Sequence, residues 1–337
     1  MVSIKEIAAA CGVSTATISK ALNGARDVSE ATRERICRMA DEMGYHPNAA
    51  ARTLKTKRTY DIGVLFKDEA GSGLTHEYFS AVLEGFKNEA EAKGYDITFI
   101  NTNNASMSYL DHCVYRNVEG VAVVCANFSD PQVLELVSGH IPVVTIDYVF
   151  NGKAAVLSDN LKGITELFQY VYGQGHRKIA FIHGALSSVT EARTVGFYRA
   201  AEELGLTVPD EYVREGVFHD AATCALLTGQ LLDLPDPPTC ILFPDDFSAL
   251  GGISEIRQRG LRIPEDISVA GYDGIHMAQV MDPPLTTLHQ KTRTMGATAA
   301  RHLIEQIEHP KTTLPHTTVV GGDLWQGRSV AAPKKRD

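Results

Sequence analysis

Carboxylates and one histidine stand where short apolar runs of the sequence end. Asp147 follows VVTI, Asp245 follows ILFP, Asp273 follows VAGY and His183 follows AFI. Such runs indicate buried strands, and ligands of open α/β sheets bind outside the carboxyl ends of the strands. Because a carboxylate accepts hydrogen bonds on both oxygens, these positions predict a site that binds hydroxyl groups.

An arginine and two aromatic residues accompany these carboxylates. Arg193 lies near the start of a predicted helix, and Tyr78 with Phe79 begins another. A guanidinium donates hydrogen bonds in a fixed fork, and an aromatic face packs against the CH surface of a sugar ring. This mixture predicts a site for a small polyhydroxylated ligand.

The spacing of these groups does not fit a catalytic site. No H-E-x-x-H, G-x-x-x-x-G-K-[ST], G-x-S-x-G or strand-following G-x-G-x-x-G occurs in the sequence. The pair Asp245–Asp246 could suggest acid–base chemistry, but adjacent side chains point in different directions, and we expect Asp246 to cap a helix. We therefore predict a protein that is not an enzyme and that has no metal site and no cofactor.

The apolar runs alternate with helical patterns. Continuous apolar runs lie at 61–66, 95–100, 120–125, 141–147, 154–159, 178–184, 239–244 and 267–273. Helical periodicity occupies 79–92, 161–172, 194–204, 221–232 and 247–259. Buried strands alternating with helices predict parallel sheets covered on both faces. The chain from residue 60 onward is too long for one such sheet, so we expect it to form an α/β core of two lobes.

Charge separates the first residues of the chain from the rest. The whole chain carries a net charge of −9, but residues 1–58 hold ten Lys/Arg and six Asp/Glu, a net charge of +4. The remaining residues hold 22 basic and 35 acidic side chains, a net charge of −13. This asymmetry predicts that only the N-terminal segment binds a polyanion.

The N-terminal segment reads as short helices joined by tight turns. Ser3 and Glu6 form a capping box, Gly12 ends the first helix, and Ser14 begins the second. A third helix begins after Ser29. The second helix turns small polar residues outward, which is typical of a helix-turn-helix that enters the major groove of DNA. An ordinary three-helix surface bundle is the alternative.

Residues 46–59, HPNAAARTLKTKRT, are basic and have Leu54 as their one large apolar residue. The segment is too short for a stable isolated helix, so it should fold against a partner. Its charge favours DNA, and a lone leucine suits a wedge between base steps in the minor groove. A plain linker between domains is the alternative.

The stretches SIKEIAAACGVSTATISKALNG, VSEATRERI and GYHPNAAARTLKTKRT resemble the DNA-binding head and hinge helix of the lactose-repressor (LacI/GalR) family of bacterial transcription regulators. The resemblance implies a helix-turn-helix domain over 1–46 and a hinge helix over 47–59. It implies DNA contacts by ten residues: Ser14, Thr15, Ala16, Thr17, Ser19, Lys20, Asn23, Asn48, Leu54 and Lys55. By the same resemblance, Thr15, Ala16 and Lys20 would occupy base-reading positions, and Leu54 the hinge position that wedges into the centre of the operator.

The body resembles the type I periplasmic-binding-protein fold through YFSAVLEGF, GHRKIAFI and GLRIPEDISVAGYD. This implies an effector-binding and dimerisation domain over 60–337, with an N-lobe of about 60–158 and 289–321 and a C-lobe of about 159–288 and 322–330. The chain is expected to cross between lobes near Asp159, Leu285–Gln290 and Gly322. The implied ligand cleft consists of Tyr78, Phe79, Asp147, Arg193, Phe218, Asp245 and Asp273.

The resemblance also implies the partners. We expect a cytoplasmic homodimer with no membrane contact, which binds double-stranded DNA at a near-palindromic operator and a small effector. Family members that bind purine bases carry an arginine in the loop that is ALSSVTEA here, with a serine at the matching place. We therefore expect a carbohydrate effector. The alternatives are a nucleobase co-repressor and a sugar-binding protein without a regulatory role.

Overall fold

The computed structural model describes residues 2–22, 25, 27–45, 53, 57–68, 71–103 and 106–334. The chain divides into two compact units, Met1–Thr59 and Tyr60–Asp337. Among the described residues, no helix is both long and apolar enough to cross a membrane. The six cysteines are all free thiols. Four of them are buried, and Cys37 and Cys125 are partly buried.

The described part of the first unit includes the helices α1 (Ile4–Cys11), α2 (Thr15–Leu22) and α3 (Glu30–Glu42). The expected caps are present: Ser3 and Glu6 bond reciprocally, Gly12 adopts φ +63° after α1, and the Ser29 side chain accepts the Thr32 N–H. Buried Ile7, Ile18 and Ile36 join the three helices in one small core. This arrangement is the predicted helix-turn-helix followed by a third helix.

The N-lobe of the second unit is built on a six-stranded sheet in the order β11-β5-β4-β3-β1-β2, with every pair parallel. Its strands are β1 (Asp61–Phe66), β2 (Asp96–Phe99), β3 (Gly120–Cys125), β4 (Val143–Ile146), β5 (Ala154–Ser158) and β11 (Thr317–Val320). One face packs on α5 (Glu77–Ala92) and α13 (Thr292–Glu308), and the other on α6 (Tyr109–Arg116) and α7 (Pro131–Ser138). The 3-10 turn η1 (Gly73–Thr75) precedes α5.

The C-lobe is built on a second six-stranded sheet, β12-β10-β9-β8-β6-β7, in which only the β10–β12 pair is antiparallel. Its strands are β6 (Ile179–His183), β7 (Val213–Glu215), β8 (Cys240–Leu242), β9 (Ser268–Asp273), β10 (Thr286–His289) and β12 (Asp323–Trp325). One face packs on α8 (Asn160–Gly173) and α9 (Ser188–Glu203), and the other on α10 (Ala221–Leu232) and α11 (Asp246–Gln258). The short elements η2 (Asp210–Tyr212) and α12 (His276–Val280) complete the lobe.

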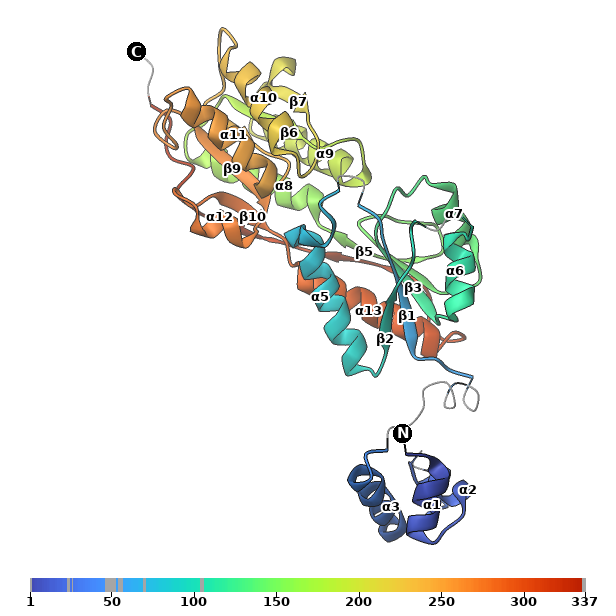
Figure 1. Ribbon diagram of the computed structural model, residues 1–337. Coiled ribbons are helices and arrows are strands. Elements are labelled where there is room, and N and C mark those ends of the chain that lie inside the picture. The colour runs from blue at the N-terminus through green and yellow to red at the C-terminus, as the bar shows by residue number, and fades with distance from the viewer. Residues whose placement is uncertain are drawn as a thin grey trace. The chain divides into compact units, whose positions relative to one another are not determined.

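The chain passes between the two sheets three times: after β5, after β10 and between β11 and β12 (Figure 1). The crossing segments therefore form the joint between the lobes. Beside this joint, the Trp325 ring of β12 stacks on His289 of β10, with ring centroids 4.1 Å apart and planes within 5°.

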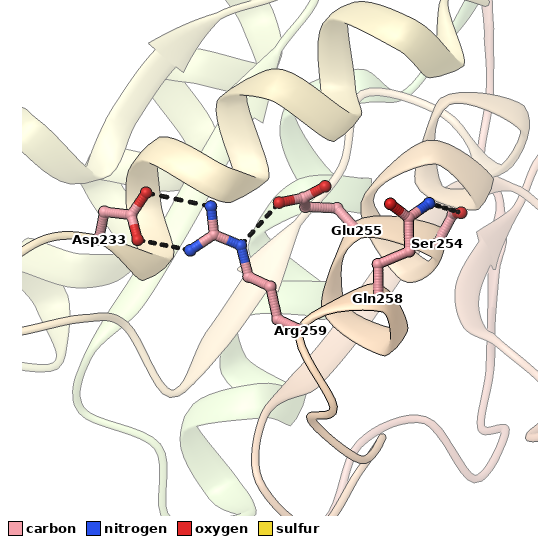
Figure 2. Close-up of polar contacts among 5 residues, drawn as sticks. All are labelled: Asp233, Ser254, Glu255, Gln258 and Arg259. Carbon is pink, nitrogen blue, oxygen red and sulfur yellow. Dashed lines mark hydrogen bonds and ion pairs between the residues drawn. The ribbon is translucent and has the colours of Figure 1, made fainter.

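Arg259 fastens two helices of the C-lobe. Its guanidinium donates two hydrogen bonds to the Asp233 carboxylate at the end of α10, at 2.5 and 3.0 Å (Figure 2). Its Nε donates to Glu255 of α11 at 2.6 Å. These bonds raise the pKa of Arg259 and lower that of Asp233.

Helices α5 and α13 lie side by side and touch through glycine (Figure 1). A Cβ on Gly296 would lie 1.9 Å from the Val82 carbonyl oxygen, and one on Gly85 would lie 2.1 Å from the Arg293 carbonyl oxygen. Neither backbone can move without displacing its helix, so the two glycines set the helix separation.

Gly296→Ala is expected to lower the free energy of unfolding by about 3 kcal/mol, because the added methyl group pushes α13 from α5. Gly173→Ala is the matched control, since a Cβ there meets nothing within 4 Å. Denaturant unfolding of both variants checks this, and equal stabilities would contradict it.

Candidate functional site

The outward surface of α2 carries the residues expected to read DNA bases. Thr15, Ala16 and Lys20 are exposed, as is Ser14 at the turn. The Ser14 hydroxyl accepts the Thr17 N–H at 3.1 Å and lies 2.9 Å from the Thr17 hydroxyl, so it caps the helix as predicted. Ser19 is half-buried beside them. Buried Ile18 and Ala21 hold the opposite face of the helix in its core.

Lys20 pairs with Asp27 at 2.5 Å, with both side chains more than half exposed. The Lys20 contact lowers the pKa of Asp27. An exposed pair of this kind adds little stability, so Lys20 can exchange Asp27 for a base or a phosphate. The other predicted DNA contacts lie outside the described residues: Asn23, Asn48, Leu54 and Lys55.

The second unit holds a cavity of about 530 Å³ lined by both lobes. The structure brings all seven predicted ligand residues to it: Tyr78, Phe79, Asp147, Arg193, Phe218, Asp245 and Asp273. His183 is absent from its lining, and the His183 Nδ1 lies 2.8 Å from the carbonyl oxygen of Gly184.

Asp147 and Tyr78 form the N-lobe side of the polar part of this cavity. The Tyr78 hydroxyl donates to the Asp147 carboxylate at 2.5 Å, and the Ser158 N–H donates to its other oxygen at 2.7 Å. Burial raises the pKa of Asp147, against the effect of these two donors. Burial, and then the charge of Asp147, raises the pKa of Tyr78 well above its ordinary value. Tyr78 is therefore held as a neutral donor.

Arg193 is the one buried cation of the C-lobe side among the described lining residues, at 5% exposure. Its Nε donates to the Asn160 side-chain oxygen at 2.8 Å and its Nη1 to the Pro244 carbonyl at 2.7 Å. The guanidinium lies over the Tyr272 ring, 3.6 Å from the centroid. These contacts fix the side chain and leave Nη2 for a ligand.

Asp273 ends β9 with φ +106° and lines the cavity together with Arg193. Gln290 donates to one Asp273 carboxylate oxygen at 2.6 Å, and the Ser158 hydroxyl in turn donates to Gln290. Burial raises the pKa of Asp273 to about 7, although the Arg193 charge lowers it. The other Asp273 oxygen accepts no hydrogen bond from the described part of the chain and is free to accept one from a ligand.

Asp245 and Asp246 have roles that differ from our expectation. Asp245, rather than Asp246, is the N-cap of α11, and its carboxylate accepts the Ser248 N–H at 2.7 Å and the His219 N–H at 2.9 Å. Asp246 accepts the N–H groups of Gly274 and Ile275 and so fixes the turn after β9. The expectation of a cap at Asp246 is wrong because the helix begins one residue earlier than its apolar pattern.

Histidines from both lobes meet at the cavity. His76 of the N-lobe stacks on His219 of the C-lobe at 4.0 Å, and His219 stacks on Phe247 at 3.9 Å. Burial, and then the neighbouring His219, lowers the pKa of His76 to about 4, so His76 is neutral. Together with the Ser188 hydroxyl, which donates to the Asp147 carbonyl at 2.9 Å, this stack joins the lobes around the cavity.

Several lining residues were not predicted from the sequence: Lys67, His76, Phe128, Tyr148, His219 and Gln290. Phe128 and Tyr148 follow β3 and β4. The rule that ligands bind outside the carboxyl ends of strands, which identified Asp147, therefore applies to them as well. Gln290 lies in a predicted crossing segment. No grouping of three metal-ligating side chains occurs within the residues that the structure describes.

The helix-turn-helix unit and the two-lobed α/β body define the class of bacterial DNA-binding regulators. Residues 3–48 match the model of bacterial regulatory proteins of the lacI family, and residues 168–330 match a periplasmic binding protein-like domain. The HTH-type transcriptional repressor PurR of Vibrio vulnificus (strain CMCP6) is 34% identical over 322 residues, which cover 92% of this chain and 94% of that protein. The chain therefore belongs to the lacI family of regulatory proteins.

Solved structures agree in fold. A complex of the transcriptional regulator CelR with cellobiose is 26% identical, with a TM-score of 0.72, and covers 98% of this chain and 100% of that one. The Lac repressor bound to ONPG in the repressed state is 25% identical, with a TM-score of 0.81, and covers 97% of this chain and 99% of that one. These relatives and neighbours are regulators and not enzymes, as predicted.

Proposed function

We propose that this DNA-binding repressor of the lacI family acts in the cytoplasm as a homodimer on a near-palindromic operator, and that a neutral carbohydrate in the interlobe cavity controls its operator affinity. The observation that carries the proposal is the convergence of Asp147, Arg193 and Asp273 on one cavity between two lobes. Two-fold symmetry of the protein would be matched by two half-sites in the DNA.

The DNA-binding part of the proposal rests on α2. Thr15, Ala16 and Lys20 are small or flexible and face solvent, so the helix can lie deep in the major groove. The net charge of +4 over residues 1–58 supplies attraction to phosphates, whereas the acidic body does not.

Lys20→Ala is expected to relax sequence preference at one base pair of each half-site, because Lys20 stands among the base-facing residues of α2. Selection of binding sites from random-sequence DNA measures this. Asp27→Asn is the control: it frees Lys20 from its ion pair and should raise affinity without changing preference. A uniform loss of affinity on all sequences for Lys20→Ala would instead assign Lys20 to a phosphate.

The lining of the cavity supports a neutral carbohydrate. The carboxylates of Asp147 and Asp273 and the guanidinium of Arg193 all line the cavity. A hydroxyl group of a ligand can therefore donate a hydrogen bond to a carboxylate and accept one from the guanidinium. Asp68 and Asp245 add negative charge, and the remaining lining cation, Lys67, pairs with Asp130 at 3.5 Å. This excess of carboxylates opposes a phosphorylated sugar.

The position of the cavity between the lobes also supports control of operator affinity by a bound ligand. Asp147 and Tyr78 belong to the N-lobe, whereas Arg193 and Asp273 belong to the C-lobe. A ligand that bonds to both sides favours one angle between the lobes over others. A change of operator affinity requires that the ligand binds the two lobe arrangements with different free energies.

A thermal-shift screen tests the effector class, because a ligand that binds only the folded protein raises its melting temperature. The probes are neutral sugars, sugar phosphates and free nucleobases. We expect a neutral sugar to give the largest increase and to change binding to an operator selected from random DNA. Stabilisation by no sugar would contradict the carbohydrate proposal.

A nucleobase is the second candidate effector, because the sequence relatives are repressors named PurR. Arg193, Asp273 and the aromatic lining could also hold a flat heterocycle. Against this candidate, the loop that carries Leu186, Ser187 and Ser188 has no arginine. Stabilisation by a nucleobase alone in the same screen would select it.

A further inference from the structure

Three aromatic rings form one cluster at the N-lobe side of the cavity, and we call Phe128, Tyr148 and Phe150 the aromatic shelf. The Phe128 and Tyr148 rings are 4.4 Å apart and parallel within 8°, and Phe150 lies 4.8 Å from Tyr148. Phe128 and Tyr148 both line the cavity. None of the three belongs to the polar group around Asp147, Arg193 and Asp273 that the proposed function uses.

The shelf is held in place by the fold. Phe128 and Phe150 pack against the hydrophobic core between the sheet and helices α6 and α7. Asp147 has φ +54°, which turns the chain after β4, and the Thr145 hydroxyl donates to the Tyr148 carbonyl. Because the rings are already ordered, a ligand that stacks on them loses little of its affinity to side-chain ordering.

Amide and hydroxyl side chains lie next to the shelf. Asn127 and Ser129 are exposed cavity residues on either side of Phe128 in sequence. Across the cavity, Leu186 of the C-lobe is 80% exposed. Aromatic and aliphatic faces with amide and hydroxyl groups beside them suit a sugar ring, which has CH faces and a rim of hydroxyl groups.

The cavity is larger than a ligand bound only to Asp147, Arg193 and Asp273 requires. Its deep residues are almost fully buried, with Arg193 at 5% and Gln290 at 2%, whereas Asn127 and Ser129 are open to solvent. A volume of about 530 Å³ equals that of about 18 water molecules in the liquid, more than one six-membered sugar ring fills.

We propose that the aromatic shelf is a second sugar subsite and that the effector is a neutral disaccharide or longer oligosaccharide. One ring bonds to Asp147, Arg193 and Asp273, and the next ring stacks on Tyr148. This inference rests on the proposed carbohydrate effector. It adds the size of the ligand and the residues that select it.

Calorimetry with matched sugars tests the subsite: glucose with cellobiose and maltose, and galactose with lactose and melibiose. We expect one disaccharide to bind the wild-type protein at least about tenfold more tightly than its monosaccharide. Tyr148→Ala should weaken the binding of that disaccharide about three- to tenfold and leave the monosaccharide unchanged, because it removes one stacking face. Tyr148→Phe should restore the disaccharide affinity.

Val149→Ala is the control, since Val149 is 50% exposed on the same loop and does not line the cavity. It should bind both sugars as the wild-type protein does. Equal binding of monosaccharide and disaccharide, or an equal loss of both in Tyr148→Ala, would overturn the subsite and leave the proposed function standing. Binding of no sugar would overturn both.

Discussion

Asp273→Asn is expected to raise the melting temperature of the ligand-free protein by several degrees at pH 8 while weakening effector binding about ten- to hundredfold. The two effects have one source. Burial raises the pKa of this carboxyl to about 7, so its ionised form is costly in the folded protein. A ligand hydroxyl, however, needs that ionised form as an acceptor, and a hydrogen bond to a charged group has a large effect on affinity.

The sign of the pH dependence follows from the raised pKa. Below about pH 4 the Asp273 carboxyl is protonated in both the folded and the unfolded chain and contributes no cost. Between about pH 4 and pH 7 the unfolded chain ionises first, so folding loses stability as the pH rises. The full cost is present above pH 7, where Asp273→Asn removes it. The gain in melting temperature should therefore be larger at pH 8 than at pH 5.

Melting curves at both pH values, with and without the effector found by the screen, measure this prediction. Glu202→Gln is the control, because Glu202 is exposed on α9 and does not line the cavity. The control should change neither quantity at either pH. An Asp273→Asn protein that is less stable at pH 8, or that binds effector normally, would show that Asp273 does not have this role.

Leu54→Ala is expected to weaken binding to the selected operator about tenfold to a hundredfold and to leave binding to unrelated DNA unchanged. The resemblance places Leu54 where the lactose-repressor family inserts a leucine at the operator centre, and the residue itself lies outside the described structure. Removing a large apolar side chain from such a site loses about 1.5–3 kcal/mol of burial. Binding to unrelated DNA depends on the basic residues, which the substitution keeps.

Lys55→Ala provides the contrast for this experiment. It removes a charge from the same segment, so it should weaken binding to operator and to unrelated DNA by the same factor and lower the salt dependence of both. Titrations of each variant on both DNAs at two salt concentrations separate the two effects. If Leu54→Ala weakened binding to operator and to unrelated DNA by the same factor, Leu54 would not act as a wedge between base steps.

The fold was largely predictable because buried parallel strands are continuously apolar. All the strands expected from apolar runs are confirmed, and α10 has the bounds that its pattern predicts. The edge strands β7, β11 and β12 were missed because they are short and only partly buried, so their sequences lack such a run. The inner strand β10 was also missed: it is buried, but its sequence TTLH has only one large apolar residue. Helix α9 begins at Ser188, well before its apolar pattern, since Ser187 caps it.

A site residue was predictable only where its own type and its position after a strand indicate its role. A carboxylate after a strand is visible in a sequence, and Asp147, Asp245 and Asp273 were found in this way. The stack of His76 on His219 was not, because the two residues come from different lobes and their contact depends on how those lobes pack. The same holds for the aromatic shelf, whose rings come from two separate loops.

The stacking of Trp325 on His289 has a practical consequence. Trp325 is the only tryptophan of the chain, and it stands in the strand that follows the third crossing between the lobes. Both rings belong to paired strands of the C-lobe sheet, and the crossing segments next to them change their surroundings when one lobe rotates against the other. The protein thus carries its single tryptophan beside the joint, and we expect the emission of this residue to change when the lobes move, without any chemical label.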